Sequence, residues 1–133
     1  MLLQLNVGMA SEPLKPFVSD GCSFFPDGTF EQHELWLACC TQHDVAYWQG
    51  GTYQQRLKAD KALAACVVQV GEPEVAKLML AGVRVGGAPL IPSPFRWGYG
   101  WPFPRDYKAL TIEEKKAIEH HLNQFKNKLK AKH

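Results

Sequence analysis

The stretch of sequence that decides the fold is Cys39-Cys40-Thr41-Gln42-His43-Asp44-Val45-Ala46-Tyr47. It lies within residues 31–48, a segment that contains no glycine or proline. Bulky or buried-type residues recur there at offsets of four, three and four, namely Trp36, Cys40, His43 and Tyr47. Offsets of this kind are typical of one face of a helix. The sequence therefore predicts a helix over residues 31–48, which Gly50-Gly51 ends.

A second helix is predicted over residues 54–70, before Gly71 and Pro73. Its apolar positions suit a stripe that faces the core: Leu57, Ala64, Val67 and Val68. Because the connection between the two predicted helices is short, we expect them to be antiparallel neighbours.

Facing positions on two antiparallel helices keep a nearly constant sum of residue numbers. If Cys39 is joined to Cys66, the residue that faces Ala46 is Ala59. Two small side chains at this second crossing point permit the helices to pack closely.

The same register places Asp60 opposite position 45, between His43 and Tyr47. We expect Asp60 to reach both an Nδ1–H group of His43 and the hydroxyl of Tyr47. A base, an orienting carboxylate and a supporting phenol would then meet at one place. Asp44 lies about 100° around the helix from His43 and points at a different target. The alternative is a histidine and an aspartate on a solvated helix face.

The chain has 133 residues, of which 46% are hydrophobic and 21% are charged, and its formal net charge is +2. This length and composition indicate one globular domain rather than a disordered chain. So small a net charge does not indicate a nucleic-acid partner. No run approaches the ~20 apolar residues of a membrane-spanning helix. The apolar start, residues 1–5, is either the remnant of a secretion signal or a plain apolar segment.

The four cysteines are Cys22, Cys39, Cys40 and Cys66. An even count in a small domain fits two disulfides, for which three pairings exist. The alternative is four free thiols in a reducing compartment, because free cysteine is also a common core residue.

Residues 39–47 resemble the active-site helix of the secreted phospholipase A2 superfamily, whose pattern is Cys-Cys-x-x-His-Asp-x-Cys-Tyr. Residues 59–66, ADKALAAC, are similar to that family's second helix, Cys-Asp-x-x-x-x-x-Cys. Ala46 and Ala59 stand where the family has two cysteines that are joined to each other. The resemblance covers residues 20–70. It implies a mainly α, phospholipase A2-like fold with two antiparallel disulfide-linked helices and a calcium loop.

The resemblance also implies the activity, which is calcium-dependent hydrolysis of phospholipid acyl esters. His43 would be the general base that activates water. Asp60 would orient the imidazole of His43, and Tyr47 would support Asp60. Asp44 would bind Ca²⁺, a hard cation that prefers oxygen ligands.

The calcium loop of the resemblance falls in residues 11–30, a segment rich in Pro, Gly, Ser and Asp that is predicted to be a loop. Backbone carbonyls there are the other expected calcium ligands, with Gly21, Ser23 and Phe25 or Asp27 as the candidates. The family's Gly-x-Gly is absent after the loop cysteine, and Phe24-Phe25-Pro26 stands in its place. The implied disulfides are Cys22–Cys40 and Cys39–Cys66.

Beyond the helix pair, a short third helix is predicted over residues 74–81. Glycine and proline recur in residues 82–104, so we expect no regular helix there. The apolar run from Leu78 to Ile91 either lines an acyl-chain slot, faces a membrane or completes the core. The aromatic residues Trp97, Tyr99 and Trp101 either lie at a bilayer interface or anchor the packing.

A last helix is predicted to open at Thr111-Ile112-Glu113-Glu114, which matches a capping box. One stripe of this helix is apolar and consists of Ile118, Leu122, Phe125 and Leu129. Lysines surround the stripe. Such a basic amphipathic helix either lies on an anionic membrane surface or covers the core with a solvated lysine face.

The sequence therefore predicts a single domain over residues 1–133 that is secreted or periplasmic and acts on phospholipid, with possible contact to a membrane surface and with Ca²⁺ as cofactor. Two alternatives remain open. One is a non-catalytic lipid- or protein-binding relative with the same scaffold. The other is a structural zinc protein with Cys39, Cys40, Cys66 and His43 as ligands, which two disulfides would exclude.

Overall fold

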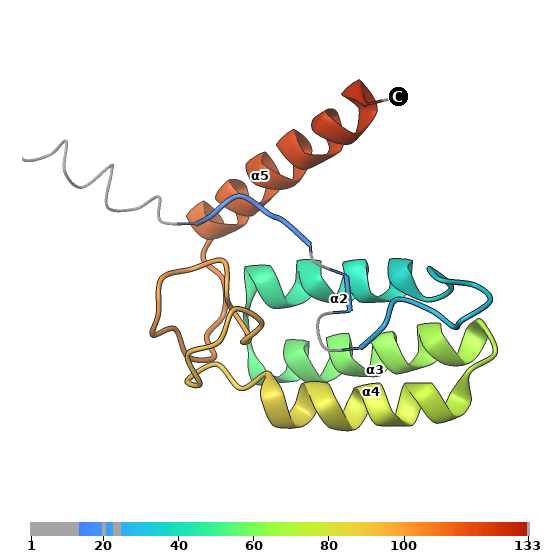
Figure 1. The fold of residues 1–133 in the computed structure, drawn as a ribbon. Coiled ribbons are helices and arrows are strands. Elements are labelled where there is room, and N and C mark those ends of the chain that lie inside the picture. The colour runs from blue at the N-terminus through green and yellow to red at the C-terminus, as the bar shows by residue number, and fades with distance from the viewer. Residues whose placement is uncertain (1–13, 20, 23–24, 133) are drawn as a thin grey trace, which may run out of the picture.

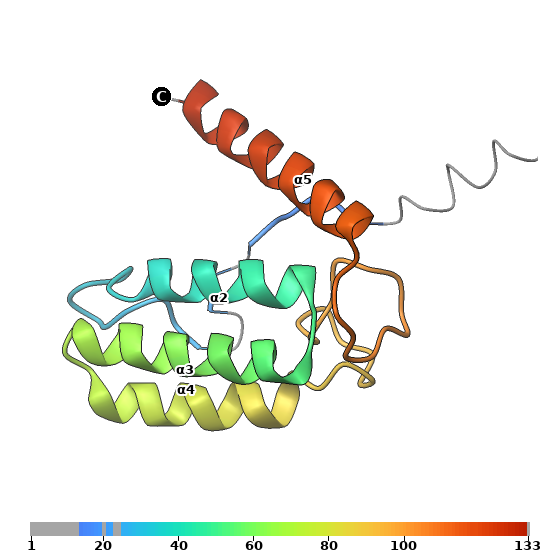
Figure 2. The same ribbon diagram turned by 180° about the vertical axis from the view of Figure 1, so that it is seen from behind.

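The structure is a computed structural model that describes residues 14–19, 21–22 and 25–132. This part of the chain contains the α-helices α2 (Leu37–Gln49), α3 (Tyr53–Gln69), α4 (Pro73–Gly86) and α5 (Ile112–Ala131), and no strand. Figures 1 and 2 show α2, α3 and α4 side by side in a row, while α5 slants away on the side of α2. The prediction of a mainly helical fold is confirmed.

Helix α2 begins at Leu37, so the prediction that it starts at residue 31 is wrong. Residues 31–36 form turns and bends instead. The Trp36 backbone N–H donates to the Asp27 carbonyl (3.0 Å), and the Trp36 indole donates to the Pro26 carbonyl (2.8 Å). These bonds to the preceding loop outweigh the local helical tendency. The helix ends as predicted at Gly50, whose φ of 69° favours glycine.

Helix α3 lies within one residue of its predicted ends, and a capping box between Thr52 and Gln55 starts it. Helix α4 runs on to Gly86, so the prediction that regular helix stops before residue 82 is wrong. Gly82 and Gly86 each cost about 1 kcal/mol in a helix relative to alanine. Packing of α4 against α3, together with the ion pair between Arg84 and Asp60 (2.7 Å), outweighs that cost.

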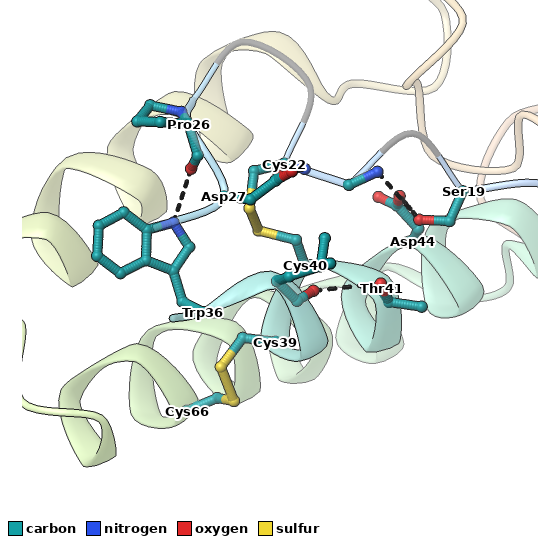
Figure 3. The surroundings of a disulfide bond; sticks show 12 residues. Ser19, Cys22, Pro26, Asp27, Trp36, Cys39, Cys40, Thr41, Asp44 and Cys66 are labelled. Carbon is teal, nitrogen blue, oxygen red and sulfur yellow. Dashed lines mark hydrogen bonds between the residues drawn. A yellow bond between two sulfur atoms is a disulfide. The ribbon is translucent and has the colours of Figure 1, made fainter. Parts of the chain in front are cut away.

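Two disulfides join α2 to neighbouring parts of the chain. Cys22–Cys40 links the preceding loop to α2, and Cys39–Cys66 links α2 to α3. These are the two expected pairs, and both are drawn in Figure 3. No cysteine is free. A zinc site made of these cysteines is therefore excluded, because the sulfur atoms are not available as thiolates.

The molecule has two hydrophobic clusters. The first lies between α2, α3 and α4, with Trp36, Leu63, Val67 and Met79 among its buried members. The second lies beneath α5, where Ile118 and Phe125 pack with Leu14, Phe17, Trp48 and Trp101. The capping box of Thr111 with Glu114 that was predicted to open α5 is present.

Residues 87–111 connect α4 to α5 without helix. Trp97 and Trp101 in this segment are each 2% exposed, and their indoles donate to the carbonyls of Gly51 (3.0 Å) and Gln49 (2.9 Å). These tryptophans therefore complete the core rather than face a membrane. In the part of the chain that the structure describes, no helix is both long enough and apolar enough to cross a membrane.

Candidate active site

His43, Asp60 and Tyr47 meet where α2 packs against α3, as the predicted register places them. His43 Nε2 lies 2.8 Å from Asp60 Oδ1, and the Tyr47 hydroxyl donates to the same oxygen at 2.7 Å. The Asp60 side chain is fully buried, and the His43 side chain is 9% exposed. The rings of His43 and Tyr47 lie side by side, with centroids 4.4 Å apart.

The ring nitrogen of His43 that faces Asp60 is Nε2, so the prediction of an Nδ1–H contact is wrong. Helix register decides which residues meet, whereas the rotation of the imidazole ring is decided by packing. An ionised carboxylate only accepts hydrogen bonds, so the proton must reside on Nε2. In the neutral ring, the basic lone pair is then on Nδ1. Among the described residues, none forms a hydrogen bond with Nδ1.

The second oxygen of Asp60 contacts two arginines. Arg84 Nε donates to Asp60 Oδ2 at 2.7 Å, and Arg56 Nε lies 3.8 Å from the same atom. Burial by itself raises the pKa of Asp60, but hydrogen bonds from His43, Tyr47 and Arg84 outweigh burial and lower that pKa below its ordinary value. Asp60 is therefore a carboxylate at neutral pH.

Arg56 links the network to Tyr107 and to the C-terminal half of α4 through four hydrogen bonds. It donates to the hydroxyls of Tyr47 (2.8 Å) and Tyr107 (2.7 Å) and to the carbonyls of Val83 (2.9 Å) and Arg84 (3.0 Å). Burial raises the pKa of Tyr47 well above its ordinary value. Tyr47 therefore keeps its proton at neutral pH and donates it in the hydrogen bond to Asp60.

Sequence reasoning missed both arginines. Arg56 lies four positions before Asp60, so both residues occupy one face of the predicted second helix, and this spacing could have revealed the pair. Arg84 is the only charged residue between Leu78 and Ile91, which was a weaker signal.

Asp44 is turned toward the loop before α2 rather than toward Asp60. The Ser19 hydroxyl donates to Asp44 Oδ2 at 2.8 Å, and the Gly21 N–H donates to the Ser19 hydroxyl at 3.2 Å. Figure 3 shows Asp44 reaching toward Ser19, while Asp27 accepts a hydrogen bond from the Cys22 N–H (3.0 Å) within the loop. No sequence signal pointed to Ser19.

The predicted calcium ligands are only partly brought together. Asp44, Gly21 and Phe25 line one cavity, and the predicted ligand Ser23 lies outside the described residues. Within residues 14–19, 21–22 and 25–132, no three His, Cys, Asp or Glu side chains form a metal-binding group. The other ligands predicted for a cation at Asp44 are carbonyl oxygens of the loop. Such an all-oxygen donor set fits calcium and does not fit zinc.

The cavity at this site has a volume of about 310 Å³, which is at the small end of the range for ligand pockets. His43, Asp44, Tyr47 and Tyr99 are the lining residues that carry polar side-chain groups. The rest of the wall is almost entirely apolar, with Phe25, Leu63, Met79, Val83 and Phe95 among its residues. The apolar wall of the cavity thus comes largely from α4 and from Phe25 and Phe95, while Trp97 and Trp101 belong to the core.

Glycines of α4 keep part of this cavity open. Gly82 and Gly86 both lie in its wall. A Cβ atom at Gly82 would approach the Phe25 ring to 3.2 Å, and one at Gly86 would lie 3.9 Å from the Phe95 ring. Side chains at these positions would reduce the space between α4 and the two rings.

A second cavity of about 240 Å³ lies between α2 and α3. Ala46, Ala59, Gln42 and His43 are among the residues that line it. The two alanines therefore do lie near each other, at the position where the resembled family has a disulfide.

No family model, no curated protein and no solved structure matches this chain.

Proposed function

We propose that the protein hydrolyses acyl ester bonds of phospholipids with the help of calcium, as a divergent relative of the secreted phospholipases A2. One observation supports the proposal most strongly. His43, whose Nε2 is fixed by Asp60, and Asp44 line the same apolar cavity of about 310 Å³. A general base, a candidate metal ligand and a site for an acyl chain are thereby adjacent.

In the proposed reaction, His43 Nδ1 removes a proton from a water molecule as the water oxygen attacks the ester carbonyl carbon. The imidazolium that forms is stabilised by the carboxylate of Asp60, which Tyr47 and Arg84 hold in place. The bond between the carbonyl carbon and the alkoxy oxygen then breaks. His43 returns its proton to the departing alkoxide, which yields a fatty acid and a lysophospholipid.

The residues that would hold calcium are Asp44, Gly21 and Phe25, which all line the same cavity, and the two loop residues would contribute carbonyl oxygens. Bound calcium would supply positive charge to polarise the ester carbonyl and to offset the charge that develops on its oxygen.

The substrate class is suggested by the apolar character of the cavity and its surroundings. Met79 and Val83 of α4 line the cavity, and Leu78 (64% exposed) and Val85 (79% exposed) of the same helix face solvent. A lipid in an aggregate would contact the side of α4 that lines the cavity, and neighbouring lipids would contact its solvent-facing side. The two disulfides support a secreted or periplasmic location, because disulfides persist in oxidising compartments.

The test is release of fatty acid from mixed phospholipid vesicles, measured for the wild type and for His43→Gln, with calcium and with a chelator. We expect calcium-dependent release by the wild type. Loss of the general base should lower the rate roughly 10²–10⁴-fold. Asp44→Asn should raise the calcium concentration needed for half-maximal rate.

His33→Gln is the matched control, because it makes the same chemical change at an exposed histidine before α2. It should leave the rate unchanged. Release that persists undiminished in His43→Gln would refute the assignment of the base. No release by folded, disulfide-bonded wild type on any of several lipids would indicate the non-catalytic binding relative.

A further inference from the structure

The C-terminal part of α5 extends past the core that the rest of the helix covers. Ile118 is buried, and the Phe125 ring packs edge-on against Phe17 with centroids 4.9 Å apart. Beyond Phe125, every residue from Lys126 to Lys132 is exposed. Figures 1 and 2 show this end of α5 projecting away from α2, α3 and α4. We refer to residues 126–132 as the α5 tip.

The α5 tip is strongly basic. It contains four lysines and no acidic residue: Lys126, Lys128, Lys130 and Lys132. In the part of the chain that the structure describes, none of these four forms an ion pair. Within residues 14–19, 21–22 and 25–132, these four charges therefore have no acidic side chain that neutralises them.

The lysines flank an apolar line rather than surround the helix evenly. Leu129 continues the direction of Leu122 and Phe125 but is 45% exposed, because the core ends before it. At about 100° per residue, Lys126 and Lys130 fall on one side of this line, and Lys128 and Lys132 fall on the other. Asn127 and Ala131 occupy the opposite face.

We infer that the α5 tip docks on the surface of an anionic phospholipid bilayer. Leu129 would enter the boundary between head groups and acyl chains, and the flanking lysines would extend to the lipid phosphates. A second copy of the tip would bring four more positive charges and is disfavoured by repulsion. Nucleic acid would use the lysines but not Leu129. This docking goes beyond the proposed hydrolysis and does not require it.

The experiment is co-sedimentation of the full, oxidised protein with vesicles of phosphatidylglycerol mixed with phosphatidylcholine, and with vesicles of phosphatidylcholine alone. A chelator is present throughout, so that hydrolysis and calcium bridging play no part. We expect binding to the anionic vesicles only, weakening as salt rises because the interaction is screened.

Lys→Gln at all four tip lysines should lower the vesicle partition coefficient roughly 100-fold or more, at the expected strength of each lysine near an anionic surface. Leu129→Ser should lower it by up to about tenfold. The matched control replaces four other exposed lysines in the same way and leaves the same net charge: Lys58, Lys61, Lys115 and Lys116. The control should bind nearly as well as the wild type. Circular dichroism should show every variant folded.

Equal losses in the tip variant and in the control would overturn the inference, because binding would then follow net charge alone. The inference would also be overturned if Leu129→Ser bound the vesicles as well as the wild type does and the wild type bound double-stranded DNA equally well. The protein would then bind polyanions in general. A dimer in sedimentation velocity that Leu129→Ser dissociates, without vesicle binding, would instead identify a second copy of the chain.

Discussion

Helices α2 and α3 are joined in two different ways along their length. Near the start of α2, the link is the Cys39–Cys66 disulfide. Further along, Ala46 and Ala59 leave a cavity of about 240 Å³, and the link is the buried carboxylate of Asp60 on α3 with its hydrogen-bond donors on α2 and α4. The covalent link holds the register without any reactive group. The polar link uses the same residues that the proposed reaction needs, so a substitution there is expected to change both stability and the proposed activity.

The largest effect on stability is expected from removal of the covalent link. Cys39→Ala with Cys66→Ala opens a disulfide that spans a sequence separation of 27. Chain entropy predicts a loss of about 3.5 kcal/mol in the free energy of unfolding. Guanidinium denaturation measures this loss. A loss below about 1 kcal/mol would mean that helix packing and the polar link alone determine the register.

A somewhat smaller effect is expected from Asp60→Asn, which removes the charge of the polar link. Arg84 and Arg56 then face a neutral amide, and the loss should be roughly 2–3 kcal/mol at pH 7, below the 3–5 kcal/mol typical of a fully broken buried pair. Glu119→Gln, at an exposed position of α5, is the matched control and should change stability by less than about 0.5 kcal/mol. Equal stabilities of the two variants would contradict the importance of the polar link.

The wild type and Asp60→Asn should also differ in how their stability depends on pH. Because the pKa of Asp60 is lowered in the folded state, its contribution to stability is fully present above its unfolded pKa of about 4. The contribution is lost as the pH falls from about 4 through the folded pKa. Denaturation midpoints of the wild type should therefore fall more steeply below pH 4 than those of Asp60→Asn. Parallel curves would contradict the lowered pKa.

The smallest effect is expected from converting the second contact into a covalent one. Ala46→Cys with Ala59→Cys should form a third disulfide and raise the free energy of unfolding by about 2 kcal/mol. Mass spectrometry under oxidising conditions detects the bond, and the single variant Ala46→Cys is the control. Failure to form the bond in a folded protein would show that the helices lie too far apart at this position.

The sequence predicted those features of the site that depend on spacing within one helix or between the two paired helices. The meeting of His43, Asp60 and Tyr47 followed from helical spacing and one assumed cross-link. The helix ends that depend on neighbouring segments were wrong. Because Trp36 forms hydrogen bonds with Pro26 and Asp27, α2 begins only at Leu37. Because α4 packs against α3, it continues past Gly82.

The sequence by itself determined a mainly helical domain, the antiparallel helix pair and, through a family resemblance, both disulfide pairs. The helices depend on periodicity within short segments, and the disulfide pairs were implied by the motifs that carry the resemblance. Only the tertiary structure decided that His43 presents Nε2 to Asp60, that Arg84 and Arg56 hold the other oxygen, and that α4 closes an apolar cavity. The physical reason is that each of these depends on side-chain packing between segments far apart in the chain, which no local pattern encodes.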